Sequence, residues 1–144
     1  MNTKTQKLKR VLLVDDDKVT NLMHGRMIKR TGLVEQIDVA TDGVAALEYL
    51  DDVAAKGDDL PELILLDINM PRMGGFEFLE QYAQLPDHIR SAKTVIIMLS
   101  TSALRTDHER AVNDPNVHRF ICKPASSEDF QNFVQEYQDV ISSN

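Results

Sequence analysis

The sequence predicts an α/β protein built on a doubly wound, parallel sheet of five strands with five helices. Short apolar segments alternate with longer segments of helical periodicity along the 144 residues, which is typical of repeated strand–helix units. Three of the apolar segments contain no polar residue, as expected of strands that helices cover on both faces. Right-handed crossovers wind such units into an open sheet, because five units are too few to close a barrel.

The expected strands are the short apolar segments, each bounded by acidic or small residues. They lie at residues 11–14, 34–40, 63–66, 95–99 and 117–121. The longest uninterrupted apolar stretch, 95–99, is far shorter than the roughly 20 residues that cross a bilayer. We therefore expect no membrane-spanning segment.

The expected helices occupy the segments between and after these strands, at 18–31, 43–55, 75–84, 103–112 and from Ser126 to about residue 141. One face of the first helix collects its apolar residues, Val19, Leu22, Met23 and Met27. Asp42 is a suitable cap for the second helix. Ser126 and Asp129 have the spacing of a capping box at the start of the last helix. The segment 103–112 is polar and has only a weak helical pattern.

Composition and charge narrow the class of protein. The formal net charge is −7, although the first ten residues carry only basic charges, so the rest of the chain is more acidic still. An acidic body argues against binding nucleic acid, which requires a basic surface. The single cysteine, Cys122, excludes an internal disulfide and fits the reducing cytoplasm, and we expect it in the sheet as a small buried apolar residue.

The chain is expected to divide into a basic leader at 1–10, one domain at 11–141 and a polar tail at 142–144, with no second domain attached.

Polar side chains follow four of the expected strands. Asp15-Asp16-Asp17 follows the first, Asp67 the third, Ser100 the fourth and Lys123 the fifth. Each has an ordinary explanation by itself, as a helix cap, a turn residue or a solvated charge. The carboxyl ends of parallel strands, however, meet at one edge of the sheet, where functional sites of this class collect. The sequence thus predicts one polar site at this edge.

The residue types at this edge indicate phosphoryl chemistry. Crowded carboxylates repel one another, and a divalent cation removes that conflict. Oxygen ligands without clustered Cys or His favour Mg²⁺ over zinc. A phosphoryl group on Asp67 would meet the metal, the ammonium of Lys123 and the hydroxyl of Ser100, which together neutralise its charge.

The same residues resemble a known family. The segments 14–16, 65–77, 99–101 and 122–124 are similar to the motifs of the receiver domain of response regulators (CheY-like) in two-component signalling, and the resemblance extends from about residue 8 to 141. It implies a flavodoxin-like sheet in the order 2-1-3-4-5. One departure is Gly74-Gly75, where the family often has Asp-Gly, and this is expected to weaken helix capping more than phosphorylation.

The resemblance implies a role for each acidic residue. Asp67 would take a phosphoryl group from the phosphohistidine of a sensor histidine kinase or histidine phosphotransfer protein. Mg²⁺ would be bound by Asp16, by Asp67, by the backbone carbonyl of Asn69 and, through water, by Asp15. No enzymatic activity is implied beyond the domain's own phosphoryl transfer and autodephosphorylation.

The resemblance also implies a switch. Ser100 would turn toward the phosphoryl group, with Thr101 as the neighbouring hydroxyl, and Lys123 would pair with it. Phe120 occupies the position of an aromatic residue that moves inward on phosphorylation, although plain core packing explains it equally well. The output surface would be the face of the fourth helix, fifth strand and fifth helix, which would bind a downstream protein or a second copy as a homodimer. We expect neither nucleic acid nor membrane as a partner.

Two alternatives use the same residues. Phosphatases of the haloacid dehalogenase type also combine a strand-end Asp nucleophile with magnesium and a lysine, but they carry a second Asp two residues later as general acid. That position here is Asn69, which cannot act in this way. The other alternative is a pseudo-receiver that keeps the fold without being phosphorylated, and the intact set of site residues argues against it.

Overall fold

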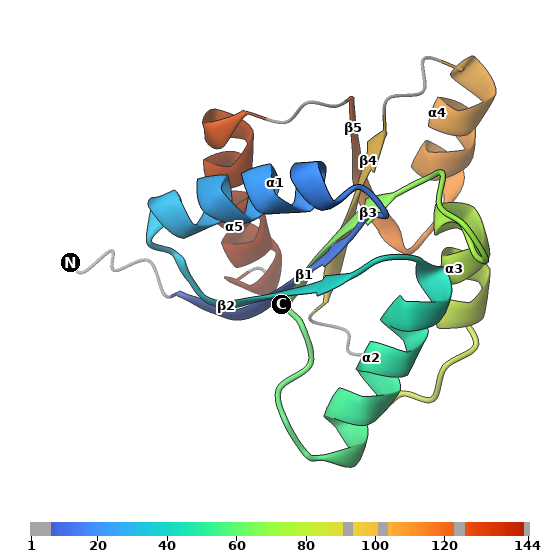
Figure 1. Ribbon diagram of the computed structural model, residues 1–144, viewed down its shortest axis with the longest axis horizontal. Helices are drawn as coiled ribbons and strands as arrows, with labels where there is room; N and C mark the ends of the chain where they lie inside the picture. Colours follow the sequence, from blue (N-terminus) through green and yellow to red (C-terminus); the bar gives the residue numbers. More distant parts are fainter. Residues whose placement is uncertain (1–6, 91–93, 101–103, 123–125, 143–144) are drawn as a thin grey trace.

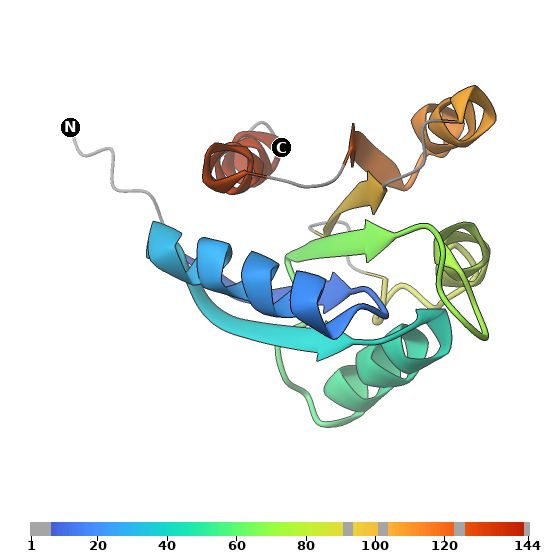
Figure 2. The same ribbon diagram turned by 45° about the horizontal axis from the view of Figure 1, so that its top comes forward.

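The structure, a computed structural model, describes residues 7–90, 94–100, 104–122 and 126–142. A five-stranded parallel sheet lies between two layers of helices (Figures 1 and 2). The strand order is β2-β1-β3-β4-β5, which confirms the predicted doubly wound sheet in the order 2-1-3-4-5. Among the described residues, no helix combines the length and the apolar character needed to cross a membrane.

Each expected strand and helix is present, with small shifts at the ends. The strands are β1 (Leu8–Val14), β2 (Val34–Ala40), β3 (Leu63–Asp67), β4 (Val95–Ser100) and β5 (Val117–Cys122). The helices are α1 (Lys18–Thr31), α2 (Gly43–Ala55), α3 (Gly75–Tyr82), α4 (Arg105–Asn113) and α5 (Ser127–Ser142). Because β1 begins at Leu8, it includes three residues of the basic segment expected to precede the domain.

The three central strands, β1, β3 and β4, hold the core because helices cover both of their faces. Alternate residues point to opposite faces, so Leu12 and Ile64 pack on one side and Leu13 and Leu65 on the other. The first side is covered by α2, α3 and α4, and the second by α1 and α5 (Figures 1 and 2). This explains why these three strands are apolar segments without polar interruptions in the sequence.

The two outer strands are only half-buried. In β5, Val117, Phe120 and Ile121 are half-buried and the other three side chains are exposed. Cys122, the last residue of β5, is exposed, so the expectation of a buried cysteine was wrong. A strand at the edge of a sheet has a neighbouring strand on one side only, so its side chains are less covered than those of the central strands.

The apolar face assigned to α1 was wrong for three of its four residues, whereas the fourth, Met27, is half-buried and packs against the core. Val19, Leu22 and Met23 are 64%, 56% and 44% exposed, whereas the buried residues of α1 are Asn21, His24 and Ile28. Specific partners allow the two polar residues to be buried: the Asn21 side-chain amide donates to the Asp15 carbonyl oxygen (2.8 Å), and the His24 ring lies edge-on to Phe130.

Helix caps follow the sequence more closely. Asp42 caps α2 by accepting a hydrogen bond from the Ala45 backbone N–H (2.8 Å). At the start of α5, the Ser126 N–H donates to the Asp129 carboxylate (2.8 Å), and the Asp129 N–H donates to the Ser126 hydroxyl (3.1 Å). The predicted capping box is therefore confirmed.

Candidate functional site

Three carboxylates meet at the carboxyl edge of the sheet. One oxygen from each of Asp15, Asp16 and Asp67 lies within 4.8 Å of the others. The strand register explains the meeting: Val14 of β1 pairs with Leu66 of β3, so the residues that follow, Asp15 and Asp67, lie side by side where the two strands end. Asp15 and Asp67 are 5% and 8% exposed, and Asp16 is exposed to solvent.

The neighbouring acidic residue, Asp17, has a structural role as a helix cap. Its carboxylate accepts hydrogen bonds from the Val19 backbone N–H (3.0 Å) and the Thr20 hydroxyl (2.9 Å), so it caps α1. Its own N–H donates to the Asp15 carboxylate (2.9 Å). Asp17 thus orients Asp15 through the backbone but is not one of the three clustered carboxylates.

The donor set fits a hard divalent cation. The cluster consists of carboxylate oxygens only, on one exposed and two buried residues. Mg²⁺ is commonly bound by one or two carboxylates with water in the other positions, whereas zinc and copper prefer nitrogen and sulfur ligands. A bound cation would also offset the repulsion among three negative charges at this separation.

Ser100 lies beside the cluster as the last residue of β4 and is fully buried. Asp67 pairs with Leu99 in the β3–β4 register, so Ser100 stands one residue further along the neighbouring strand. Ser100 in turn pairs with Cys122 of β5, the residue before Lys123. The predicted sites Thr101 and Lys123 themselves lie outside the described residues.

Phe120 is half-buried on β5, on the side of the sheet covered by α2, α3 and α4. Its ring lies edge-on to the ring of His108 on α4, with 5.0 Å between the centroids. Phe120 therefore contacts both the core and α4, the helix that precedes its strand.

The loop that follows Asp67 requires glycine at its end. A Cβ atom on Gly75 would lie 2.3 Å from the Asp67 carbonyl oxygen, which is closer than van der Waals contact allows. The Gly75 N–H instead donates to the Ile68 carbonyl (2.8 Å) and closes the base of the loop. Gly74 has no side chain to cap α3, but its N–H donates to the Glu77 carboxylate (3.0 Å). Asn69, in the loop between Asp67 and Gly75, is exposed to solvent.

One feature beside the site was missed in the sequence. The Arg72 guanidinium donates two hydrogen bonds to the Asp42 carboxylate, at 2.7 and 3.1 Å, and joins the β3–α3 loop to the start of α2. These bonds hold the pKa of the Asp42 carboxyl below its usual value. Arg72 and Asp42 are 30 residues apart in the sequence, and Asp42 by itself predicted only a helix cap.

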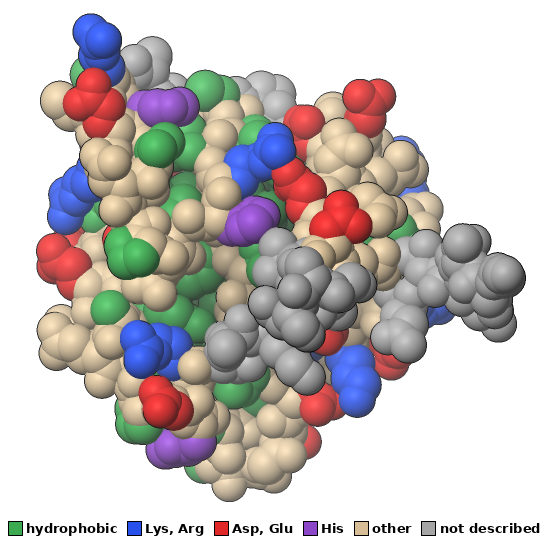
Figure 3. All heavy atoms as spheres, turned by 180° about the vertical axis from the view of Figure 1, so that it is seen from behind, with side chains coloured by type: hydrophobic (Ala, Val, Ile, Leu, Met, Phe, Trp, Pro, Cys, Tyr) green, Lys and Arg blue, Asp and Glu red, His purple; other side chains and the backbone are tan. Residues whose placement is uncertain are grey.

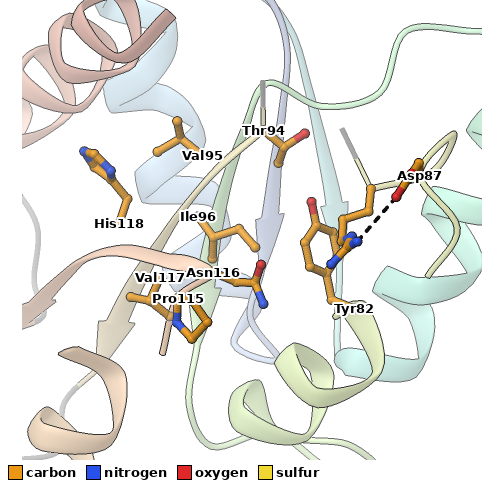
Figure 4. A pocket seen from close by; sticks show the side chains of 10 residues that line it. Tyr82, Asp87, Thr94, Val95, Ile96, Pro115, Asn116, Val117 and His118 are labelled. Atoms are coloured by element: carbon orange, nitrogen blue, oxygen red, sulfur yellow. Dashed lines mark hydrogen bonds and ion pairs between the residues drawn. The ribbon is translucent and has the colours of Figure 1, made fainter. Parts of the chain in front are cut away.

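A hollow of about 690 Å³ lies elsewhere, among residues at the amino ends of β4 and β5 (Figure 4). Several of the polar groups that line it already have partners. Arg90 forms an ion pair with Asp87 (3.4 Å), and the Thr94 hydroxyl donates to the Pro61 carbonyl (2.8 Å). The carboxylate cluster lies at the opposite, carboxyl ends of the strands, so this hollow is no part of it.

Among the described side chains on the face seen in Figure 3, acidic and basic groups are interspersed with hydrophobic ones and form no single basic patch. This agrees with the acidic net charge of the chain.

The fold and the acidic cluster define a class of protein: single α/β domains that carry carboxylates at the carboxyl edge of a parallel sheet. Comparison with known families identifies which one. The sequence model of the response regulator receiver domain family matches residues 11–135 of this chain, and the chain belongs to this family. The domain is therefore a receiver of two-component signalling, a family of phosphoacceptors.

Individual relatives support the same family assignment. The probable methanogenesis regulatory protein FilR2 of Methanothrix harundinacea is 32% identical over 129 residues, which cover 90% of this chain and 81% of FilR2. Response regulator Rcp1 of Synechocystis is 26% identical over 94% of this chain and 90% of its own length. Among solved structures, a two-component response regulator from Cytophaga hutchinsonii has a TM-score of 0.84 at 30% identity, covering 93% of this chain and 99% of that one.

Proposed function

We propose that Asp67 is the phosphoacceptor, and that the domain takes a phosphoryl group from the phosphohistidine of a sensor kinase or phosphotransfer protein. A carboxylate oxygen of Asp67 forms the new bond to phosphorus while the bond between phosphorus and the donor's imidazole nitrogen breaks. The observation that carries the proposal is the carboxylate cluster, in which Asp67 comes from β3 and its companions Asp15 and Asp16 come from β1.

The proposed metal site uses the same cluster. Asp16, Asp67 and the backbone carbonyl of Asn69 would hold Mg²⁺, and Asp15 would act through water. When bound, the cation neutralises charge on the phosphoryl oxygens. Asp67 and Ser100 are buried where their strands end, whereas Asp16 is exposed, so the proposed site opens to solvent on the Asp16 side.

The remaining predicted residues would stabilise the phosphorylated state. The Ser100 hydroxyl, with Thr101 as its neighbour, donates a hydrogen bond to the phosphoryl group, and Lys123 pairs with its charge. No side chain in this assignment serves as a general acid two residues after the nucleophile, since Asn69 stands there. This favours a regulator, with no activity beyond its own phosphorylation and dephosphorylation, over a phosphatase.

The direct test is phosphorylation by acetyl phosphate, with and without Mg²⁺, followed by intact mass. We expect the wild type to gain one phosphoryl group only with Mg²⁺, and Asp67→Asn to gain none. Asp17→Asn is the matched control, because asparagine also caps helices and Asp17 lies outside the cluster. Absence of uptake by the wild type under any condition would leave a pseudo-receiver that binds partners without phosphorylation.

The donor would approach along α1, which begins at Lys18, two residues after Asp16. Val19 and Met23 are exposed on this helix, and apolar side chains at such positions are suited to contact a helical partner. With a kinase that phosphorylates the wild type, Met23→Glu should slow transfer from the kinase while leaving uptake from acetyl phosphate unchanged. Equal slowing with both donors would exclude this docking role.

The output would pass from Ser100 and Phe120 to the face of α4, β5 and α5, and from there to a downstream protein in the cytoplasm or to a second copy of the chain. Phe120 contacts His108 of α4, which gives the strand a direct connection to the helix. We expect a phosphate mimic to change backbone amide exchange within 104–122. If exchange there is unaffected while the mimic is bound, this route for the signal is wrong.

A further inference from the structure

The β3–α3 loop, residues 68–74, is attached to the start of α2 by two neighbouring contacts. The Arg72 side chain donates to both oxygens of Asp42, and the Gly43 backbone N–H donates to the Met73 carbonyl (2.9 Å). The backbones approach so closely that a Cβ atom on Gly43 would lie 2.8 Å from the Met73 carbonyl oxygen. The outer half of the loop is therefore docked on α2.

Three constraints fix the geometry of the ion pair between Asp42 and Arg72. The Asp42 side chain is 6% exposed and also accepts the capping hydrogen bond of α2, so it cannot move without releasing the helix terminus. Arg72 has φ +61°, a left-handed conformation that a residue other than glycine adopts only when its surroundings hold it there. A bidentate contact between guanidinium and carboxylate fixes direction as well as distance.

We propose that Asp42 and Arg72 form a latch that positions the β3–α3 loop for Mg²⁺ binding, so that both are positioning residues for a metal that neither touches. The inference rests on the proposed function of the cluster and extends it to a second group of residues. Asn69, whose carbonyl is the proposed third protein ligand, lies between the two attachments of the loop: the Gly75–Ile68 hydrogen bond at its base and the latch at its outer end.

The physical reason is the strict geometry of Mg²⁺. The ion demands near-octahedral coordination, so a backbone carbonyl on a loosely held loop is a poor ligand. Without the latch, residues 69–73 gain conformational freedom that must be lost again when the metal binds. Groups hydrogen-bonded directly to a metal ligand typically change metal affinity by roughly 10–100-fold when removed. The latch acts through the loop, and we expect a smaller effect of about 3- to 10-fold.

Arg72→Ala tests the latch because two explanations predict opposite changes in the affinity for Mg²⁺. By charge alone, removing a cation near a cation site tightens Mg²⁺ binding. By loss of the latch, binding weakens about 3- to 10-fold. The dissociation constant is measured from Mg²⁺-induced shifts of the Gly74 and Gly75 amides and by calorimetry. Arg72→Lys keeps the charge but loses the bidentate contact, and it should also weaken binding.

The controls separate the latch from general effects. Arg105→Ala removes an exposed arginine from a surface ion pair on α4 and should not weaken Mg²⁺ binding. In an Asp42→Asn background, where the cap persists but the ion pair is lost, Arg72→Ala should add little. With acetyl phosphate, the Arg72→Ala rate should fall at low Mg²⁺ and recover at saturating Mg²⁺.

Unchanged or tighter Mg²⁺ binding by Arg72→Ala would overturn the latch, as would an equal effect in the Asp42→Asn background. Failure of the proposed function is distinguishable from these results. If the wild type bound Mg²⁺ but took up no phosphoryl group, the phosphoacceptor assignment would fall while the affinity measurements would still decide the latch. A wild type that bound no Mg²⁺ would refute both.

Discussion

At the scale of single residues, the site depends on backbone positions that tolerate no side chain as much as on its carboxylates. Gly75 lets the chain pass directly over the Asp67 carbonyl, and Gly43 lets α2 approach the loop that follows Asp67. In each case the close approach is made by the main chain of a glycine, to the Asp67 carbonyl oxygen or to Met73, so neither contact is visible in the residue types that first indicate the site. They hold the nucleophile and its loop in place through the main chain.

Gly75→Ala should therefore destabilise the protein by about 1–3 kcal/mol or more, because the new methyl group collides with the Asp67 backbone. It should also slow phosphorylation by acetyl phosphate, since the displaced atoms belong to the nucleophile. Urea unfolding and intact mass measure the two effects. Gly25→Ala is the matched control: outside its own helical turn, no heavy atom lies within 4 Å of its new Cβ, and a mid-helix alanine should raise stability by about 0.5–1 kcal/mol. Equal effects at both positions would contradict this explanation.

The pKa of Asp42 predicts a pH dependence. Hydrogen bonds from Arg72 lower this pKa, so the folded state binds the proton less readily than the unfolded state does. The carboxylate then contributes stability at pH values above its ordinary pKa of about 4, and the contribution is lost as pH falls through the folded value. Asp42→Asn should thus lower the free energy of unfolding by a constant amount above about pH 5, and the difference from wild type should shrink below about pH 4. Urea unfolding from pH 7 to pH 3 measures it, and a difference that stays constant over the whole range would refute the assignment.

At the scale of elements, α5 shows how one helix joins distant parts of the chain. Phe130, Phe133, Val134 and Tyr137 are each 1% exposed and pack on the sheet and α1. The Tyr137 hydroxyl donates to the Glu62 carboxylate (2.8 Å), which lies just before β3. Burial and the neighbouring Glu62 carboxylate raise the pKa of the Tyr137 hydroxyl. The same helix carries part of the proposed output face, so its packing limits how far that face can move.

The cap of α5 offers a test at this scale. Ser126→Ala removes the acceptor for the Asp129 N–H and should lower the free energy of unfolding by about 1 kcal/mol. Ser127→Ala, one residue further and exposed, should change it by less than about 0.5 kcal/mol. Thermal and urea unfolding of both variants make the comparison. A larger loss for Ser127→Ala than for Ser126→Ala would show that the helix begins elsewhere.

At the scale of the whole molecule, the sheet brings together carboxylates from β1 and β3, and folding must overcome their mutual repulsion. Asp16→Asn removes one of three charges within 4.8 Å and should stabilise the metal-free protein by about 1 kcal/mol, given that Asp16 is exposed. The wild type should gain stability when Mg²⁺ replaces a chelator, by mass action, and Asp16→Asn should lose most of that gain. Thermal unfolding with chelator and with Mg²⁺ measures both effects. A variant that responds to Mg²⁺ as strongly as the wild type would exclude Asp16 as a ligand.

The sequence was most informative where one interaction dominates. Apolar segments such as those of β3 and β4 predict buried strands because few structures can hide so many apolar residues in succession. The Ser126–Asp129 cap is local and depends on spacing alone. The meeting of Asp15, Asp16 and Asp67 followed from the single rule that parallel strands end at the same edge.

The sequence by itself therefore determined the fold class, the order of elements and the acidic residues of the candidate site. Only the tertiary structure decided which face of α1 is buried, that Cys122 is exposed at the sheet edge, and that Arg72 reaches Asp42. Periodicity and composition record what each segment prefers on average. Which polar side chain is buried, and which residues meet across 30 positions of the chain, depends on partners that only the folded chain brings together.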